Sequence, residues 1–278
     1  MNDSSLNRWR LIALAASLLF VLALDRVKAL PRHQVNVEMQ VVIPLAVQVA
    51  MAAGDRYLAA NMAGIRALVS STENMRENEY RVLARGQDDV AWLNPAHEDN
   101  YDTAAAILPW SGELEAAQTI LARATDARPF DYLPAFYYGF HLLHFKHDPV
   151  GASEWLRRAA EKLPEGDDRL TMQNFAAQWM DRSRDIDLAI RVVDGMARQA
   201  KRKDFRAYLE MRVERLRGLK QVRAAAEVFR QRFARPLADP AELVRSGLLP
   251  DLPADPFGFG FAIDKRGEVV LRNSPPPS

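Results

Sequence analysis

The sequence predicts an all-α protein, in which an α-α helical-repeat solenoid follows an apolar N-terminal segment and ends in a small β-hairpin tail. Apolar residues recur at three- and four-residue steps between residues 45 and 236, as they do on amphipathic helices. Within that region one block of sequence returns after 35 residues, which indicates tandem repeats. Beyond residue 236, prolines and glycines replace the helical pattern.

The composition is that of a folded protein. Of the 278 residues, 49% are hydrophobic and 26% are charged, so the chain can bury a sizeable core. A formal net charge of +1 gives no overall attraction to nucleic acid, and we expect no such partner. The absence of cysteine excludes disulfides, thiolate zinc sites and cysteine nucleophiles, and the sequence predicts no cofactor.

The N-terminal region predicts a membrane segment. A short flank over residues 1–10 contains Arg8 and Arg10, and Leu11–Leu24 is an unbroken run of apolar or small residues. A basic flank before such a run is typical of an export signal or an anchor. As a helix the run spans about 21 Å, and Arg10 and Arg26 can reach the bilayer interface from either end.

Two fates of the segment over residues 11–29 stay open. Val27 and Ala29 have the small size and the spacing of a cleavage site, and cleavage would leave a soluble periplasmic protein. The charges between Asp25 and Lys28 oppose cleavage, because that region is usually neutral. We expect a single-pass anchor in a bacterial inner membrane with the repeat domain in the periplasm, and cleavage is the alternative.

The helical region follows a linker over residues 30–44. Asp55 is well placed to cap the first long helix, and Thr72 is a candidate cap for the next one. We expect that second helix to end before Asn94-Pro95, because the residue before a proline avoids the helical conformation.

The clearest signal is an internal repeat, in which Leu114–Pro129 and Val150–Pro164 align at a constant offset of 35 residues. The matched positions are Ala117 with Ala152, Leu121 with Leu156, Ala124 with Ala159, and Pro129 with Pro164. Another helical stretch precedes each block, over residues 101–108 and 133–145, so the unit is a pair of helices. A small residue lets two helices approach, a large aliphatic residue fills the groove between them, and the proline ends the helix.

These positions resemble the second helix of the tetratricopeptide repeat (TPR), and Tyr101 and Phe136 fall where its first helix has an aromatic residue. The resemblance implies a TPR-like domain over residues 45–236. It includes a third pair of helices over 170–197, and a fourth pair whose two helices span 205–217 and 222–233.

The whole chain also resembles uncharacterised membrane-anchored TPR proteins of Gram-negative bacteria. The stretches that resemble them are GDRYLAAN (54–61), NPAHEDNYDTAAAILPW (94–110) and DPFGFGF (255–261). This resemblance implies an architecture and a location, but no particular activity.

The tail over residues 237–278 differs from the repeats. It contains several prolines, and Ala241–Gly247 predicts one short helix. Phe257–Ile263 and Glu268–Leu271, joined by a turn at residues 264–267, predict a β-hairpin. We expect this tail to pack as a cap on the repeats, and contact with pilus- or secretion-like machinery is the alternative.

Histidines are the candidate metal ligands and catalytic groups. His141, His144 and His147 lie within one 120° arc of a helix, where three imidazoles can hold a metal ion or else pack and cap the helix. His97 precedes three polar residues at 98–100. This cluster suits either a general base or the N-terminus of a helix, which favours acidic residues.

Aromatic side chains are the first candidates for partner binding. Tyr132, Phe136, Tyr137, Tyr138 and Phe140 cluster on one predicted first helix. First helices line the binding surface of many repeat arrays, where Tyr and Phe serve as anchors. We therefore assign Tyr132, Phe136, Tyr137 and Tyr138 to a partner-binding surface, with packing in the core as the alternative.

Charge is uneven along the chain. Residues 87–131 contain nine acidic and two basic side chains, whereas residues 198–235 contain thirteen basic and four acidic ones. A basic surface can bind anionic lipid or an acidic partner, or it can be an ordinary solvated face. Arg212 and Arg215 in this segment complete the candidate partner-binding residues.

The sequence therefore predicts a protein–protein interaction scaffold or assembly factor of the bacterial cell envelope rather than an enzyme. Its expected partners are envelope proteins and, through the N-terminal helix, the membrane. The alternative is an envelope metal-binding protein or enzyme that uses His97 or the three spaced histidines.

Overall fold

The computed structural model describes residues 13–21, 23, 41–70 and 75–273, in two compact units over residues 1–38 and 39–278. In the first unit, residues 13–21 and 23 are helical. None of the helices in these described ranges is both long and apolar enough to cross a membrane. The predicted anchor spans residues 11–29 and lies largely outside the described residues, so it stays a prediction.

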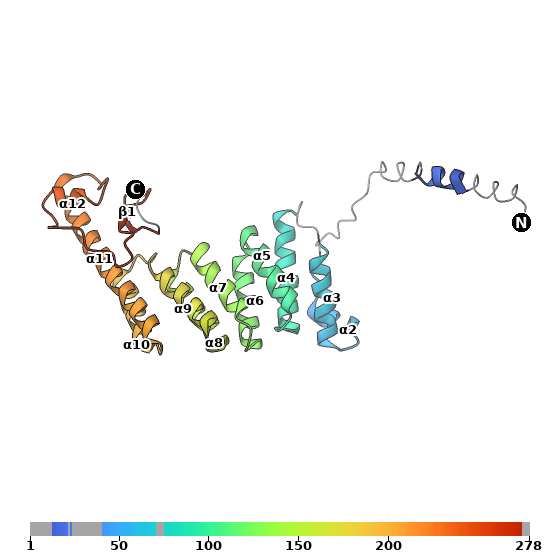
Figure 1. The fold of residues 1–278 in the computed structure, drawn as a ribbon. Coiled ribbons are helices and arrows are strands. Elements are labelled where there is room, and N and C mark those ends of the chain that lie inside the picture. Colours follow the sequence, from blue (N-terminus) through green and yellow to red (C-terminus); the bar gives the residue numbers. More distant parts are fainter. Residues whose placement is uncertain (1–12, 22, 24–40, 71–74, 274–278) are drawn as a thin grey trace, which may run out of the picture. The chain divides into compact units, whose positions relative to one another are not determined.

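The second unit is mostly helical (Figure 1), which confirms the predicted class. Its helices are α2 (Leu45–Met51), α3 (Arg56–Leu68), α4 (Glu77–Leu93), α5 (Glu98–Ile107), α6 (Leu114–Ala127), α7 (Leu133–His144), α8 (Pro149–Lys162), α9 (Asp167–Met180), α10 (Ile186–Gln199), α11 (Lys203–Phe233) and α12 (Glu242–Arg245). A 3-10 turn, η1 (Leu108–Ser111), extends α5. The strands β1 (Phe261–Ile263) and β2 (Val269–Leu271) form the C-terminal antiparallel hairpin.

Helices α3 to α11 pack against one another in chain order, as helical hairpins do in a stack (Figure 1). The alanines and leucines of the predicted second-helix pattern are all buried, and they are Ala117, Leu121, Ala124, Ala152, Leu156 and Ala159. Pro129 and Pro164 are exposed and follow the ends of α6 and α8. Gly139 on α7 shows how close this packing is, because a Cβ atom there would lie 3.0 Å from the Ala152 carbonyl oxygen of α8. Small residues at these positions therefore allow the helices of a hairpin to touch.

Polar contacts between neighbouring hairpins join residues about one repeat apart. Arg123 pairs with Asp88, Lys162 donates to the Thr125 and Arg128 carbonyls, and Lys201 pairs with Glu165. Their separations of 34 to 37 residues match the 35-residue offset of the sequence repeat. The periodicity of the sequence is therefore also the periodicity of the contacts.

Two predicted helix ends agree with the structure, whereas the start of α4 differs, because Arg76 is its N-cap residue. Asp55 caps α3, since its carboxylate accepts hydrogen bonds from the backbone N–H groups of Tyr57 and Leu58. Helix α4 ends at Leu93, before Asn94-Pro95. Thr72 lies outside the described residues, and α4 begins only at Glu77.

The predicted fourth pair of helices is wrong, because α11 runs without a break from Lys203 to Phe233. Gly218, at the expected boundary, is part of this helix. A Cβ atom there would lie 3.3 Å from both Phe261 and Pro253 of the tail. The glycine therefore permits a close approach of the tail, and does not mark a turn.

The tail takes the place of the missing second helix, which confirms that it packs as a cap. Its residues Leu237, Leu243, Leu249, Phe261, Val269 and Leu271 are buried in one cluster with α9, α10 and α11. The hairpin pairs Phe261 with Leu271 and Ile263 with Val269. Its first strand begins later than predicted, because the Asp255 carboxylate accepts backbone hydrogen bonds from residues 257, 259 and 260 and holds them in a turn.

Arg212 and Arg215, assigned from the sequence to a partner-binding surface, are instead buried, with side chains 7% and 4% exposed. Arg212 pairs with Asp181 at 2.6 Å, and Arg215 pairs with Asp255 of the tail at 3.1 Å. Arg215 also donates to the Arg272 carbonyl, so it ties both ends of the hairpin region to α11. These guanidinium groups hold the tail in place, and a partner could reach them only by displacing it.

Replacing Arg215 should therefore destabilise the tail strongly. Arg215→Ala leaves the buried Asp255 carboxylate without its cation, and we expect a loss of about 3–5 kcal/mol in the free energy of unfolding. The control Arg217→Ala removes an exposed pair with Glu214 on the same helix, and should cost less than about 1 kcal/mol. Denaturant unfolding of both variants measures the difference, and equal losses would contradict this role for Arg215.

Candidate partner-binding surface

Two of the predicted partner-binding aromatics pack between helices. Tyr138 on α7 stacks on Trp155 of α8, with ring centroids 3.7 Å apart. Phe136 on α7 lies near Trp179 of α9, with centroids 6.4 Å apart. Both side chains therefore contribute to packing within and between hairpins, which was the alternative role for this cluster.

The other two aromatics, Tyr132 and Tyr137, lie near each other, and Tyr137 also lies near carboxylates. Burial raises the pKa of the Tyr137 hydroxyl, and the nearby Asp102, Tyr132 and Asp131 raise it further. The Tyr101 hydroxyl donates a 2.6 Å hydrogen bond to Asp131. Tyrosine side chains and carboxylates from α5 and α7 thus share one neighbourhood.

We call this neighbourhood the acidic–tyrosine surface. Its members are Glu98, Asp99 and Asp102 of α5, together with Asp131, Tyr132 and Tyr137 in or just before α7. Glu98 and Asp99 are exposed, and the others are half-buried. The surface thus combines aromatic area with negative charge on two successive first helices.

Asp102 is the least favourable group of this surface. Burial raises the pKa of its carboxyl, and the negative charges of Glu98, Asp131 and Asp99 raise it further. Its Oδ1 atom is buried and has no hydrogen-bond partner in the part of the chain that the structure describes. Such an arrangement costs stability, because a buried oxygen without a partner loses its hydrogen bonds to water and gains none in return.

Arg128 neutralises part of the acidic charge. Its Nε lies 2.6 Å from Asp131 and its Nη2 lies 2.8 Å from Glu98, and it also donates to the Ala96 carbonyl. Burial alone would raise the pKa of the Asp131 carboxyl, but hydrogen bonds from Tyr101, Arg128 and the Leu133 backbone, together with the charge of Arg128, lower it. Asp131 is therefore satisfied, whereas the buried Asp102 Oδ1 has no hydrogen bond within the described ranges.

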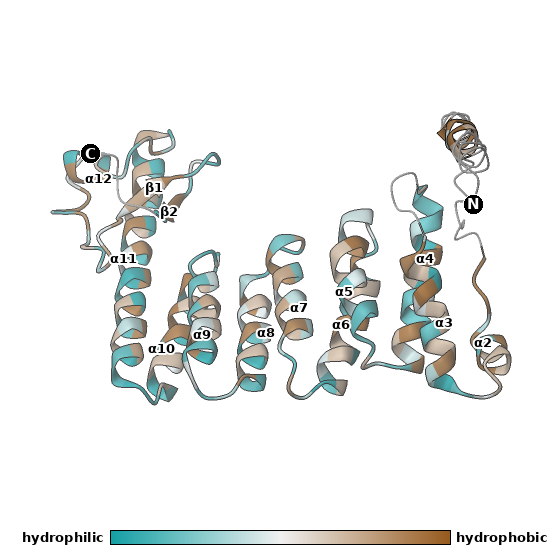
Figure 2. Ribbon diagram, turned by 45° about the vertical axis from the view of Figure 1, so that its right-hand side comes forward, coloured by the Kyte–Doolittle hydropathy of each residue, from teal (hydrophilic) through white to brown (hydrophobic). Residues whose placement is uncertain are grey.

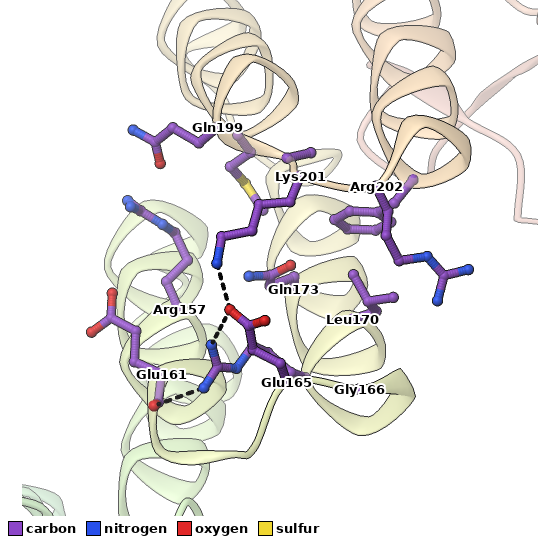
Figure 3. Close-up of a pocket in the computed structure, with 13 residues that line it drawn as sticks. Arg157, Glu161, Glu165, Gly166, Leu170, Gln173, Gln199, Lys201 and Arg202 are labelled. Carbon is purple, nitrogen blue, oxygen red and sulfur yellow. Dashed lines mark hydrogen bonds and ion pairs between the residues drawn. The ribbon is translucent and has the colours of Figure 1, made fainter.

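A separate cleft of about 250 Å³ lies where the α8–α9 and α10–α11 turns meet (Figure 3). Lys201 extends across it to the Glu165 carboxylate, which also lies 3.9 Å from Arg169. Arg202 pairs with Asp167 on the same side. The cations of this cleft already have anionic partners. Its ion pairs therefore join two hairpins, and these cations are not available to bind an anionic ligand.

Most basic side chains of the segment over residues 198–235 also have anionic partners. Arg198, Lys201, Arg202, Arg212, Arg215, Arg217, Lys220, Arg230 and Arg235 all form ion pairs. The positive charge of the sequence is therefore largely compensated in space. The acidic segment provides the more distinctive surface.

The three spaced histidines have different surroundings. His141 is buried, its Nε2 lies 3.1 Å from the Ala105 carbonyl oxygen, and burial lowers its pKa to about 4. The His144 ring stacks on Phe140 and contacts Trp110. Over the described ranges, no three His, Cys, Asp or Glu side chains are grouped so that they could hold a metal ion. The geometry thus adds no support to the predicted metal site, which includes His147.

His97 lies where α3, α4 and α5 meet. It precedes α5 but makes no capping hydrogen bond, and its ring lies against Gly64 of α3. Asn100 donates to the Gln87 carbonyl of α4 at 3.0 Å, so this polar cluster joins neighbouring helices. The helix begins at Glu98, which places the acidic residues in its first turn rather than at its cap.

Sequence reasoning missed Asp102 and Asp131 as members of a surface. A signal was present, because Glu98 and Asp102 are like charges four residues apart on one helix, which is normally unfavourable. The proximity of Asp131 came only from the packing of α7 on α5 and α6. Comparison with known proteins adds nothing to these assignments, since no family model, curated protein or solved structure matches the chain.

The buried His141 predicts a pH dependence of stability. Its pKa is lower in the folded state than the value of about 6.5 expected in the unfolded chain, so the unfolded chain binds a proton more readily between about pH 6.5 and pH 4. Stability should therefore fall by up to about 3 kcal/mol as the pH drops through this window.

His141→Gln, which can still donate to Ala105, should remove most of this loss when unfolding is measured at pH 7 and pH 4.5. The control His147→Gln changes an exposed histidine just after the same helix and should retain the loss. An unchanged pH dependence in His141→Gln would show that other groups cause it.

Proposed function

We propose that the protein is a membrane-anchored, TPR-like scaffold that binds a protein partner in the bacterial cell envelope. The observation that supports this most directly is the acidic–tyrosine surface on the successive first helices α5 and α7. The TPR-like assignment is supported by the buried alanines and leucines at a 35-residue offset, and by the polar contacts that repeat at nearly the same separation.

The energetics of Asp102 favour a binding role for this surface. A surface under selection for stability alone would not bring four carboxylates together and leave a buried oxygen of one of them without a partner. Proteins retain such unfavourable groups where function uses them. A cationic side chain from a partner would satisfy Asp102 and lower the pKa of its carboxyl.

The partner chemistry follows from the two kinds of side chain present. Carboxylates bind lysine and arginine, and tyrosine rings offer faces for cations and for apolar side chains. The proposed partner therefore presents a basic segment with apolar or arginine side chains at the contact. Such binding should weaken as salt is raised, because the acidic groups at the rim are exposed.

Crosslinking in the membrane followed by affinity capture tests the scaffold. The variant Asp99→Lys/Asp102→Lys reverses two charges of the acidic–tyrosine surface and should lose the captured partner. The control Asp168→Lys/Glu210→Lys makes the same change in net charge at exposed positions on α9 and α11, and should keep it.

A partner retained equally by both variants would contradict this surface as the binding site. Circular dichroism of both variants shows whether the fold is intact, so that a loss of capture is assigned to the surface. Full-length protein that captures no partner under any condition would contradict the scaffold itself.

The anchor is supported by the apolar run Leu11–Leu24 and by its basic flank. Full-length protein should remain in the membrane pellet after an alkaline carbonate wash, and removal of residues 11–24 should release it. A soluble product that begins near Ala29, detected by mass spectrometry, would contradict the anchor and establish cleavage.

A further inference from the structure

Helix α3 has an unusual outer face. Six of its apolar side chains are 46–61% exposed, and they are Tyr57, Leu58, Met62, Ile65, Leu68 and Val69, the last directly after the helix end. At 100° per residue these positions fall within an arc of about 140°, in which Asn61 is the one polar residue. The opposite face consists of small residues and packs on α4 through Ala60 and Ala67, while Gly64 lies against His97 before α5.

This face lies at the N-terminal end of the helix stack and continues onto α2, where Val47 and Met51 are also exposed. Figure 2 shows apolar segments on α2 and α3, whereas α11 near the other end is largely hydrophilic. An apolar groove of about 180 Å³ between Val41–Ile43, α2, α3 and α4 adjoins it. Terminal helices of repeat arrays normally have a polar outer face. We therefore expect another surface to cover the apolar face at this end.

We infer that this apolar face of α3 lies on the surface of the lipid bilayer. The inference rests on the proposed anchor, since only 20 residues (25–44) separate the apolar run from α2. A connection of this length spans at most about 70 Å. Insertion of the apolar run would therefore hold α3 close to the membrane.

One cation of α3 flanks the apolar face. At 100° per residue, Arg66 lies about 40° beyond the edge of this face, whereas Arg56 lies on the side that packs on α4. The Arg56 guanidinium donates to the Trp92 carbonyl and lies over the Tyr57 ring, and the Trp92 side chain is 58% exposed. Arginine, tryptophan and tyrosine beside an apolar face are typical of helices that lie in the headgroup region.

A second copy of the chain matches this face less well. Pairing two α3 faces would place Arg66 of both copies at the margin of one interface, where like charges disfavour association. Phospholipid headgroups instead offer negative charge at the position of Arg66. The observations thus favour the bilayer as the occupant of the face.

Single-cysteine labelling tests the inference cleanly, because the chain has no cysteine of its own. A nitroxide is attached to full-length Ile65→Cys, reconstituted in vesicles of phosphatidylethanolamine and phosphatidylglycerol. The control is Val228→Cys on α11, which is similarly exposed at 48% but lies near the other end of the stack. The measured quantity is the ratio of the label's collision rate with oxygen to its collision rate with a water-soluble nickel complex. We expect this ratio to be several-fold higher at position 65 than at position 228.

Flotation of the same samples distinguishes failure of the proposed anchor from failure of the proposed contact between α3 and lipid. Protein that fails to float with vesicles contradicts the anchor, whereas protein that floats with equally water-exposed labels contradicts only the contact of α3 with lipid. Dipolar broadening between labels at position 65 would show that a second copy covers the face, and would overturn the inference. A label at position 65 that is shielded from both oxygen and nickel, without such broadening, would overturn it in favour of a protein segment.

Discussion

Close contact between helices at small side chains is the constraint on which the rest of this structure depends. Ala117 and Ala152 are fully buried, and any side chain at Gly139 would meet the backbone of α8. Because these contacts recur about every 35 residues, each hairpin presents nearly the same edge to the next. A single hairpin cannot bury its apolar face alone, so the stack is stable only as a whole.

The two ends of the stack solve this problem differently. At the C-terminal end, the tail covers α11, and Arg215 ties it there through Asp255. At the N-terminal end, α3 leaves its apolar face exposed among the described residues. Between them, stacking brings Asp102 and Asp131 together although neither helix alone would do so. Both proposals thus concern places where packing of the repeats leaves unfavourable groups: clustered carboxylates in one case and exposed apolar side chains in the other.

Much of the fold followed from local sequence patterns. Apolar periodicity located most of the helices, Asp55 marked the start of α3, and Asn94-Pro95 marked the end of α4. The prediction failed at α11, where a break was expected between residues 217 and 222, an interval that contains Gly218. A glycine is compatible with either a turn or a close contact, and only the position of Phe261 distinguishes the two.

The sequence by itself determined the helical class, the repeat period and the terminal hairpin, because these depend on neighbours within about 35 residues. Only the tertiary structure decided which charged and aromatic side chains face solvent. Arg212 and Arg215 look like surface residues in a basic segment, yet the tail covers them. Tyr137 and Tyr138 are adjacent in sequence, yet one adjoins carboxylates and the other stacks on Trp155. Exposure depends on what packs against a residue from distant parts of the chain, and local patterns do not contain that information.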